Sequence, residues 1–155
     1  MKKLLPILAV VLLGAAACAR PFEPWPYDKL TQEADLIVIA TPTSGHDTAE
    51  RTTFPNIVRT DTNNIRSAIP AIGVETTFTI LAVLKGSSGT NALVFHHLRE
   101  AGPATSINGP ALVAFDPKEG KRFLLFLKRE TDGRYAPLTG QTDPAGGVKD
   151  LGTSP

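Results

Sequence analysis

The sequence predicts an all-β fold, a small barrel or sandwich, and three observations support this prediction. Five or six short apolar segments recur at spacings near ten residues. Glycine- and proline-containing turns separate these segments, and the sequence shows neither a long amphipathic helix nor an internal repeat. Short strands that alternate regularly with turns are typical of antiparallel barrels and sandwiches. With 155 residues, the chain is long enough for one domain with its own apolar core.

The predicted elements begin with a short helix from Asp28, its expected capping residue, to about Ala34. A β-branched apolar run predicts the first strand at 36–40, and Pro42 is expected to end it. The clearest strand lies at 74–84, because its side chains alternate between an apolar and a polar face. The remaining strands are predicted at 91–98, 111–115, 121–129 and, as a short sixth, within 133–140.

Three segments lack a pattern that predicts regular structure. Residues 43–72 are polar and contain two prolines, and a connection of this length is typical of functional or disordered loops. Within this segment, only residues 52–60 suit an edge strand. We therefore expect a long loop at 43–72, a second loop at 99–110 and a flexible tail at 141–155. The two loops are the candidate contact surfaces.

Residues 1–17 have the three parts of a secretory signal peptide. Lys2 and Lys3 precede ten mostly apolar residues, and small residues follow. A transmembrane anchor needs about 20 apolar residues, so this run is too short for one. Cleavage would remove two of the 16 Lys and Arg residues and none of the 15 Asp and Glu residues, which leaves a net charge of −1. Because the charges are dispersed, nucleic acid is not an expected partner.

Cys18 is the only cysteine, and it ends the apolar run, where two cleavage sites compete. Ala17-Cys18-Ala19 fits the pattern of the general signal peptidase, which would discard the cysteine. Alternatively, the alanines before Cys18 resemble a bacterial lipobox, although Ala15 stands where leucine is usual. A lone cysteine is unusual in an exported chain, since thiols are oxidised there. We therefore favour lipid attachment at Cys18, followed by a proline-rich tether at 18–29.

Three stretches carry a family resemblance: "ADLIVIA", followed by the long variable segment, then "FTILAVLKG" and "KRFLLFL". Their layout, over residues 34–127, resembles the OB-like barrel of the netrin and tissue-inhibitor-of-metalloprotease (TIMP-like) group, and also uncharacterised bacterial envelope proteins. The resemblance implies a five- to six-stranded OB-like barrel at 30–140 with a long loop between its first two strands. Inhibitors of that group chelate a protease's zinc through an N-terminal cysteine that disulfides fix. This chain has no second cysteine, so that activity is not carried over.

His96 and His97 are the obvious candidates for catalysis or metal binding, because histidine is the commonest general base and metal ligand. Neighbours on a strand point to opposite faces, so one metal ion is not expected to bind both. His46 lies in the predicted loop, and no zinc or hydrolase motif includes any of the three. We expect two surface or half-buried histidines, with no catalytic residue, no metal site and no cofactor.

Other polar and aromatic residues have structural interpretations. Asp35 is expected to set the start of a strand. Gln141 and Asp143 lie in a glycine-rich segment that suits a loop held by Asx turns, or else a cation or glycan site, and we favour the turns. Trp25 and Tyr27 suit either packing on the barrel or a position at lipid headgroups, and the sequence leaves both alternatives open.

The sequence thus predicts a non-catalytic binding or structural module, exported and anchored in the bacterial envelope by a lipid at Cys18. Its expected partners are the membrane and an envelope protein, and a soluble periplasmic or secreted protein is the alternative. Two other functions stay open: a protease inhibitor acting through surface loops, and a hydrolase that uses His96 or His97. A histidine beside Asp or Glu in a concave pocket would favour the hydrolase, and a rigid convex loop would favour the inhibitor.

Overall fold

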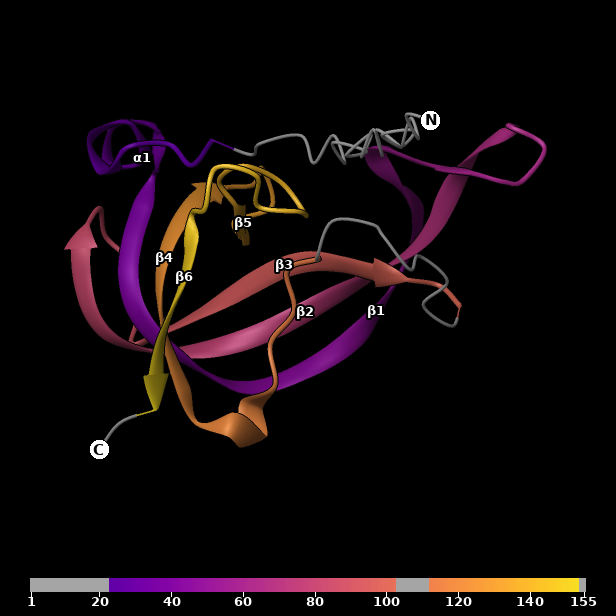
Figure 1. Ribbon diagram of the computed structural model, residues 1–155. Helices are drawn as coiled ribbons and strands as arrows, with labels where there is room; N and C mark the ends of the chain where they lie inside the picture. The colour runs from indigo at the N-terminus through magenta and orange to yellow at the C-terminus, as the bar shows by residue number, and fades with distance from the viewer. Residues whose placement is uncertain (1–22, 103–111, 154–155) are drawn as a thin grey trace, which may run out of the picture.

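The computed structural model describes residues 23–102 and 112–153, and strands dominate it (Figure 1). The signal segment 1–17 and Cys18 lie outside the described residues. The elements are α1 (Tyr27–Glu33), β1 (Leu36–Thr60), β2 (Arg66–Lys85), β3 (Ala92–Glu100), the 3-10 helix η1 (Pro117–Glu119), β4 (Lys121–Arg129), β5 (Tyr135–Pro137) and β6 (Val148–Thr153). The prediction of an all-β fold is confirmed.

Hydrogen-bonded pairing connects five of the strands into a ring. β1 pairs antiparallel with both β2 and β4, and β2 pairs antiparallel with β3. The short strand β5 completes the ring, because it lies antiparallel to β4 and parallel to β3. Its link to β3 is the single pair of Phe95 with Tyr135, so the ring has its weakest strand pairing there. β6 pairs with β4 and extends the sheet beyond the ring.

Five predicted strands are confirmed, and the fourth of the six is wrong. Residues 112–115, the described part of the strand predicted at 111–115, form no strand. Val113 and Phe115 pack against the core without pairing in the sheet, whereas Ala114 is exposed. The ring of Phe115 stands edge-on to Phe78 and Phe95, with centroids 4.8 and 5.0 Å away, a favourable geometry for aromatic side chains. Val113, 8% exposed, joins the same core.

The predicted loop at 43–72 is also wrong, because β1 and β2 continue through it and only residues 61–65 connect them. The segment is polar because much of this long hairpin faces solvent. Its prolines do not end the strand either. Pro42 and Pro55 fall at register shifts of the β1–β2 pairing, where a bulge frees a residue from donating a backbone N–H.

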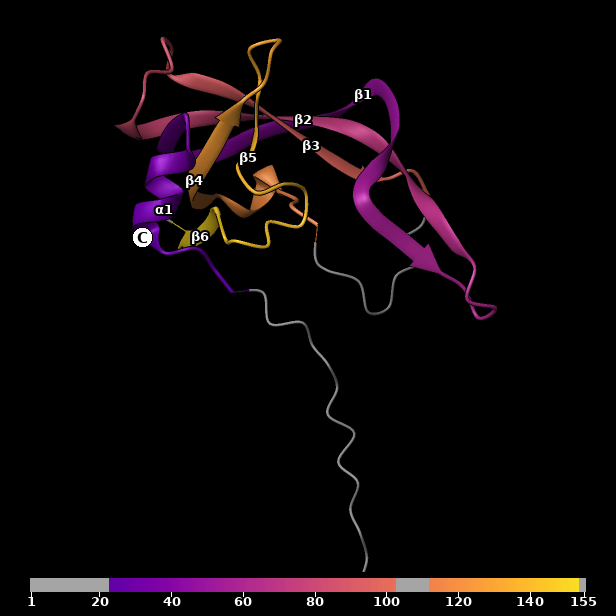
Figure 2. The same ribbon diagram turned by 90° about the horizontal axis from the view of Figure 1, so that it is seen from above.

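The far part of this hairpin, residues 51–70, forms a two-stranded projection that we call the ribbon. In both views it lies at the opposite end of the molecule from α1 (Figures 1 and 2). A small second core packs its base; the members are Phe54, Ile69, Ala71 and Leu98, with Ile57 and Leu112 beside them. At the tip, the Asp61 carboxylate accepts hydrogen bonds from the backbone N–H groups of Asn63 and Ile65. Packing and hydrogen bonds therefore order the ribbon at both ends.

The predicted helix is confirmed, with a different start. It begins at Tyr27, inside the segment 18–29 expected to be a tether, and Asp28 lies in its first turn and does not cap it. Lys85, at the end of β2, caps the other end: its Nζ donates to the backbone oxygens of Thr31 and Ala34 at 2.7 and 2.6 Å. A cation at this end of a helix also opposes the helix dipole. The helix is thereby held to the sheet.

The described part of the predicted flexible tail, residues 141–153, is folded. Its last strand, β6, pairs with β4. The side-chain oxygen of Gln141 accepts a hydrogen bond from the Leu98 backbone at 2.6 Å. The carboxylate of Asp143 accepts bonds from the backbone N–H groups of Gly147 and Val148. Polar contacts, which leave no apolar pattern in the sequence, hold much of this segment in place. The sequence alone therefore suggests a flexible tail.

Candidate functional site

His96 and His97 lie side by side on β3 and point to opposite faces, as strand geometry predicts. The expectation that they would be surface or half-buried residues is wrong, because they are only 8% and 5% exposed. Acidic side chains cover His96, and the segment before η1 covers His97. Both histidines therefore have internal partners that decide what each can do.

His96 lies between two carboxylates. Its Nδ1 lies 3.0 Å from both oxygens of Glu130, which follows β4, and its Nε2 lies 2.9 Å from Oε2 of Glu50 in β1. The contact with Glu130 is a hydrogen bond, whereas the contact with Glu50 is a close ion-pair distance without hydrogen-bond geometry. Through the two carboxylates, His96 links β1, β3 and the end of β4.

Gly73 makes room for this contact. A Cβ atom at this position would lie 2.5 Å from Oγ1 of Thr48 and 2.7 Å from Oε2 of Glu50. Thr48 also donates a hydrogen bond to the Gly73 carbonyl at 3.2 Å. The absence of a side chain on β2 thus lets β1 cross it closely enough for Glu50 to reach His96.

The polar contacts continue from His96 across the same face. His46, Glu75 and His96 occupy directly paired positions on β1, β2 and β3. Arg134 joins this row, because its guanidinium lies 3.0 Å from Glu75 and 3.5 Å from Glu130. We call the set Glu50, His96, Glu130, Arg134 and Glu75 the carboxylate–histidine network. It ties the base of the ribbon to the turn between β4 and β5.

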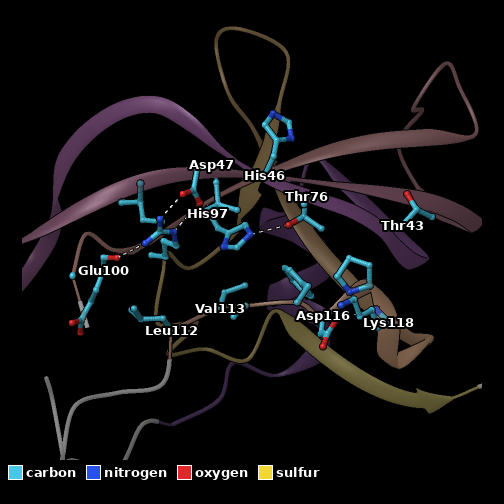
Figure 3. Close-up of a pocket in the computed structure, with 18 residues that line it drawn as sticks. Thr43, His46, Asp47, Thr76, His97, Glu100, Leu112, Val113, Asp116 and Lys118 are labelled. Carbon is cyan, nitrogen blue, oxygen red and sulfur yellow. Dashed lines mark hydrogen bonds and ion pairs between the residues drawn. The ribbon is translucent and has the colours of Figure 1, made fainter. Parts of the chain in front are cut away.

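His97 faces the other way, into a pocket of about 970 Å³ between β1–β3 and residues 112–118 (Figure 3). Its Nε2 lies 2.9 Å from Oγ1 of Thr76. The pKa of His97 is lowered to about 4, mainly by burial; the Val113 backbone acts in the opposite direction, and the nearby His96 contributes to the lowering. His97 is consequently neutral near neutral pH.

An ion pair stands at the edge of this pocket. The guanidinium of Arg99 donates to both carboxylate oxygens of Asp47. This hydrogen bonding holds the pKa of Asp47 below its ordinary value and raises that of Arg99. Asp116 and Lys118 lie across the pocket, while the ring of His46 points away from it (Figure 3). The charged groups are thus at the rim, and Val74, Leu112 and Phe115 supply apolar walls.

The arrangement limits the chemistry available to the pocket. Thr76 is 2% exposed, so its hydroxyl is poorly placed to attack a substrate. A histidine whose pKa is about 4 is a weak base at neutral pH. The carboxylates that contact a buried histidine, Glu50 and Glu130, lie on the other face of β3. Within residues 23–102 and 112–153, no group of three or more His, Cys, Asp or Glu side chains is arranged to hold a metal ion.

Asp35 sets the junction between α1 and β1. Its backbone N–H donates to the Leu127 carbonyl at 2.8 Å, and its carboxylate accepts from the Arg129 N–H at 2.9 Å. This second bond holds the pKa of Asp35 below its ordinary value. Together the contacts fix where β1 begins to pair with β4. Asp35 has the structural role that the sequence indicates.

No protein-family model matches the chain, and no curated protein is significantly similar to it. In the part of the chain that the structure describes, no helix is long and apolar enough to cross a membrane.

Proposed function

We propose that this protein is a non-catalytic binding module, exported and lipid-anchored at Cys18, that contacts an envelope protein through its ribbon. We further propose that its ring of five strands is an OB-like barrel of the TIMP-like kind. One observation carries the functional proposal: the ribbon is a projection whose orientation is held by polar and apolar contacts at its base. The carboxylate–histidine network uses Glu50 and His96 for this purpose, and the second core uses Phe54 and Leu98.

The surface of the ribbon suits a protein partner. Val58 and Ile65 are large apolar residues that are 43% and 62% exposed. In the described part of the chain, β1 beyond Ala40 pairs only with β2, so its other edge has backbone groups that a partner strand can pair with. The ribbon also contains three arginines and one aspartate, which favours an acidic partner. Rigidity reduces the entropy lost on binding.

The site residues support a binding role over a hydrolytic one. His97, the histidine that lines the pocket, is hydrogen-bonded to a buried hydroxyl and has a depressed pKa. Carboxylates cover both nitrogens of His96, Nδ1 through a hydrogen bond with Glu130 and Nε2 through the nearby Glu50, and a general base needs a nitrogen within reach of substrate. Both histidines are better suited to support the fold.

A protease inhibitor is the second candidate, favoured by the ribbon's ordered convex tip. Asp61 accepts two backbone hydrogen bonds there and holds Ile65 in an exposed position. Such an inhibitor would present residues 61–65 to the active site of a protease. This candidate shares the contact surface with the main proposal and differs only in the class of partner.

Photo-crosslinking in cells that produce the protein tests the proposal. A photoreactive amino acid is introduced at Val58 or at Ile65, and the matched control is Leu84, which is 59% exposed at the end of β2, away from the ribbon. We expect the same partner to be crosslinked from both ribbon positions and not from Leu84. If the crosslinked partner is a protease, the protein acts as a protease inhibitor, which is the second candidate function. The absence of a ribbon-specific adduct would overturn the proposal.

The anchor has its own test, the intact mass and N-terminal peptide of the mature protein from the membrane fraction. A chain that begins at an acylated Cys18 is the expected result. A soluble chain that begins at Arg20 and lacks cysteine would overturn the anchor and leave the ribbon proposal to the crosslinking result.

A further inference from the structure

Two aromatic residues and two lysines cluster around the start of α1. Nζ of Lys29 lies 3.8 Å from the ring centroid of Trp25, and Nζ of Lys149 lies 5.9 Å from that of Tyr27. The Trp25 backbone N–H donates to the Ala145 carbonyl at 3.1 Å, so the cluster is attached to the folded domain. We call Trp25, Tyr27, Lys29 and Lys149 the aromatic–lysine cluster.

The fold buries only part of this cluster. Tyr27 packs beside Phe126, with ring centroids 6.0 Å apart, yet 61% of Tyr27 is exposed. Leu151, two residues after Lys149 on β6, is 43% exposed. Exposed aromatic rings beside lysines are typical of surfaces at membrane headgroups, where the rings stay in the interface and the ammonium groups reach water and phosphate.

The position of the cluster along the chain points to the same partner. The described structure begins at Glu23, and an extended chain from Cys18 to Glu23 spans at most about 17 Å. A lipid on Cys18 would thus hold the cluster close to the headgroup layer, which is on the order of 6 Å thick on each side of the bilayer. This step rests on the proposed lipid anchor.

We propose that the aromatic–lysine cluster lies in the headgroup region of the phospholipid membrane that holds the anchor. The domain then stands on α1 and β6, and the ribbon, at the opposite end of the molecule, faces away from the bilayer (Figures 1 and 2). Exposed Glu23 and Asp28 offset the charges of Lys29 and Lys149. Apolar contact and headgroup hydrogen bonds carry this docking more than attraction to anionic lipid does, so we expect it to depend little on salt.

Trp25 provides the measurement because it is the only tryptophan, and Cys18 provides a unique attachment point because it is the only cysteine. The chain from Cys18 onward, made without lipid, is coupled through its thiol to a maleimide phospholipid. The vesicles contain phosphatidylethanolamine and phosphatidylglycerol, with a nitroxide quencher at the headgroup. This attachment is independent of whether cells acylate Cys18.

We expect the quencher to reduce Trp25 emission about twofold, and the vesicles to shield Trp25 from aqueous acrylamide. Tyr27→Ser and Leu151→Ser should restore most of the emission and the acrylamide access. Leu84→Ser is the matched control, since Leu84 is 59% exposed and lies outside the cluster. All three positions are exposed, so folding should persist, and circular dichroism checks this.

Two results would overturn the inference. One is a coupled protein whose Trp25 stays unquenched and accessible to acrylamide. The other is equal loss of quenching in Leu84→Ser and Tyr27→Ser, which would indicate non-specific proximity. If quenching occurs as expected but the protein from cells carries no lipid on Cys18, the anchor fails and the membrane-facing surface remains.

Discussion

Oε2 of Glu50 lies 2.9 Å from Nε2 of His96, although the two residues belong to strands that do not pair with each other. β2 lies between those strands, and the contact passes over it at Gly73. Glu130 lies on the other side of the imidazole, so His96 links the base of the ribbon to the end of β4. Besides the second core, the His96 imidazole and the absence of a side chain at Gly73 therefore help to set the orientation of the ribbon.

Replacing the imidazole is the direct test of this link. We expect His96→Leu to lower the free energy of unfolding by about 1–3 kcal/mol, because Glu130 loses its hydrogen-bond partner and Glu50 loses the ring that lies 2.9 Å from it. Both carboxylates are partly exposed and can regain water, which limits the loss. Urea denaturation measures it, and proteolysis within the ribbon should accelerate.

His46→Leu is the control for that experiment. The His46 side chain is 65% exposed and lies 3.6 Å from Glu75, so its loss should change the free energy of unfolding by less than about 0.5 kcal/mol. Equal destabilisation by the two variants would contradict the assigned role of His96.

The missing side chain is tested by Gly73→Ala. The added Cβ would meet Oγ1 of Thr48 and Oε2 of Glu50 within 2.7 Å, so these β1 side chains must shift and the contact of Glu50 with His96 is disturbed. We expect a loss of about 1–3 kcal/mol in unfolding free energy. Gly45→Ala is the control on the same hairpin, because its Cβ would have no heavy atom nearer than 3.5 Å. A neutral Gly73→Ala would show that Glu50 does not need this space.

Much of the sheet could be predicted from local sequence, and the strand at 121–129 shows why. Its apolar run is bounded by basic residues and turns, so β4 has the predicted bounds. The ribbon at 51–70 lacks such a run because it is a two-stranded projection whose side chains largely face solvent. Only its pairing with itself makes it regular, and pairing is not a local property.

The site was harder to predict than the fold. The sequence identifies His96 and His97 as neighbours on a strand, and strand alternation separates them correctly. Glu50 and Glu130 were missed, because their approach to His96 depends on the register of β1 and on the turn after β4. His46, Glu75 and His96 form a row of directly paired polar residues across three strands. This row could have pointed to the site, but it is visible only once the strand register is known.

His97 gives a prediction for acid stability. Its pKa is about 4 in the folded protein and 6.5 ordinarily, so above pH 6.5 the ring is neutral in both the folded and unfolded states. Between pH 6.5 and 4, the unfolded chain binds a proton that the folded protein does not. The free energy of unfolding therefore decreases as the pH is lowered through this range. The loss attributable to His97 should reach about 3 kcal/mol at pH 4.

His97→Gln isolates this contribution, since glutamine keeps a polar group near Thr76 and does not titrate. Urea denaturation of both proteins at pH 7 and pH 4 gives the four free energies needed. We expect the variant to lose about 3 kcal/mol less than the wild type between these pH values. An identical loss would mean that His97 is protonated in the folded protein.

Asp143 should act as a structural residue of the C-terminal segment. Its carboxylate accepts hydrogen bonds from Oγ1 of Thr139 and from the backbone N–H groups of Gly147 and Val148, all within 2.8 Å. Asp143→Ala would leave these donors without their acceptor, and we expect it to cost about 2–3 kcal/mol of unfolding free energy. Hydrogen exchange at Val148 should accelerate as β6 loosens.

Asp150→Ala is the matched control, because Asp150 also accepts a backbone bond, from Gly152, but lies exposed within β6. Its loss should cost less than about 1 kcal/mol. Calcium ions should not raise the melting temperature of the wild type, since the bonds to Asp143 already occupy its carboxylate oxygens. A calcium-dependent rise that Asp143→Ala removes would instead make this loop a cation site, and the stability assigned to its hydrogen bonds would then belong to the bound ion.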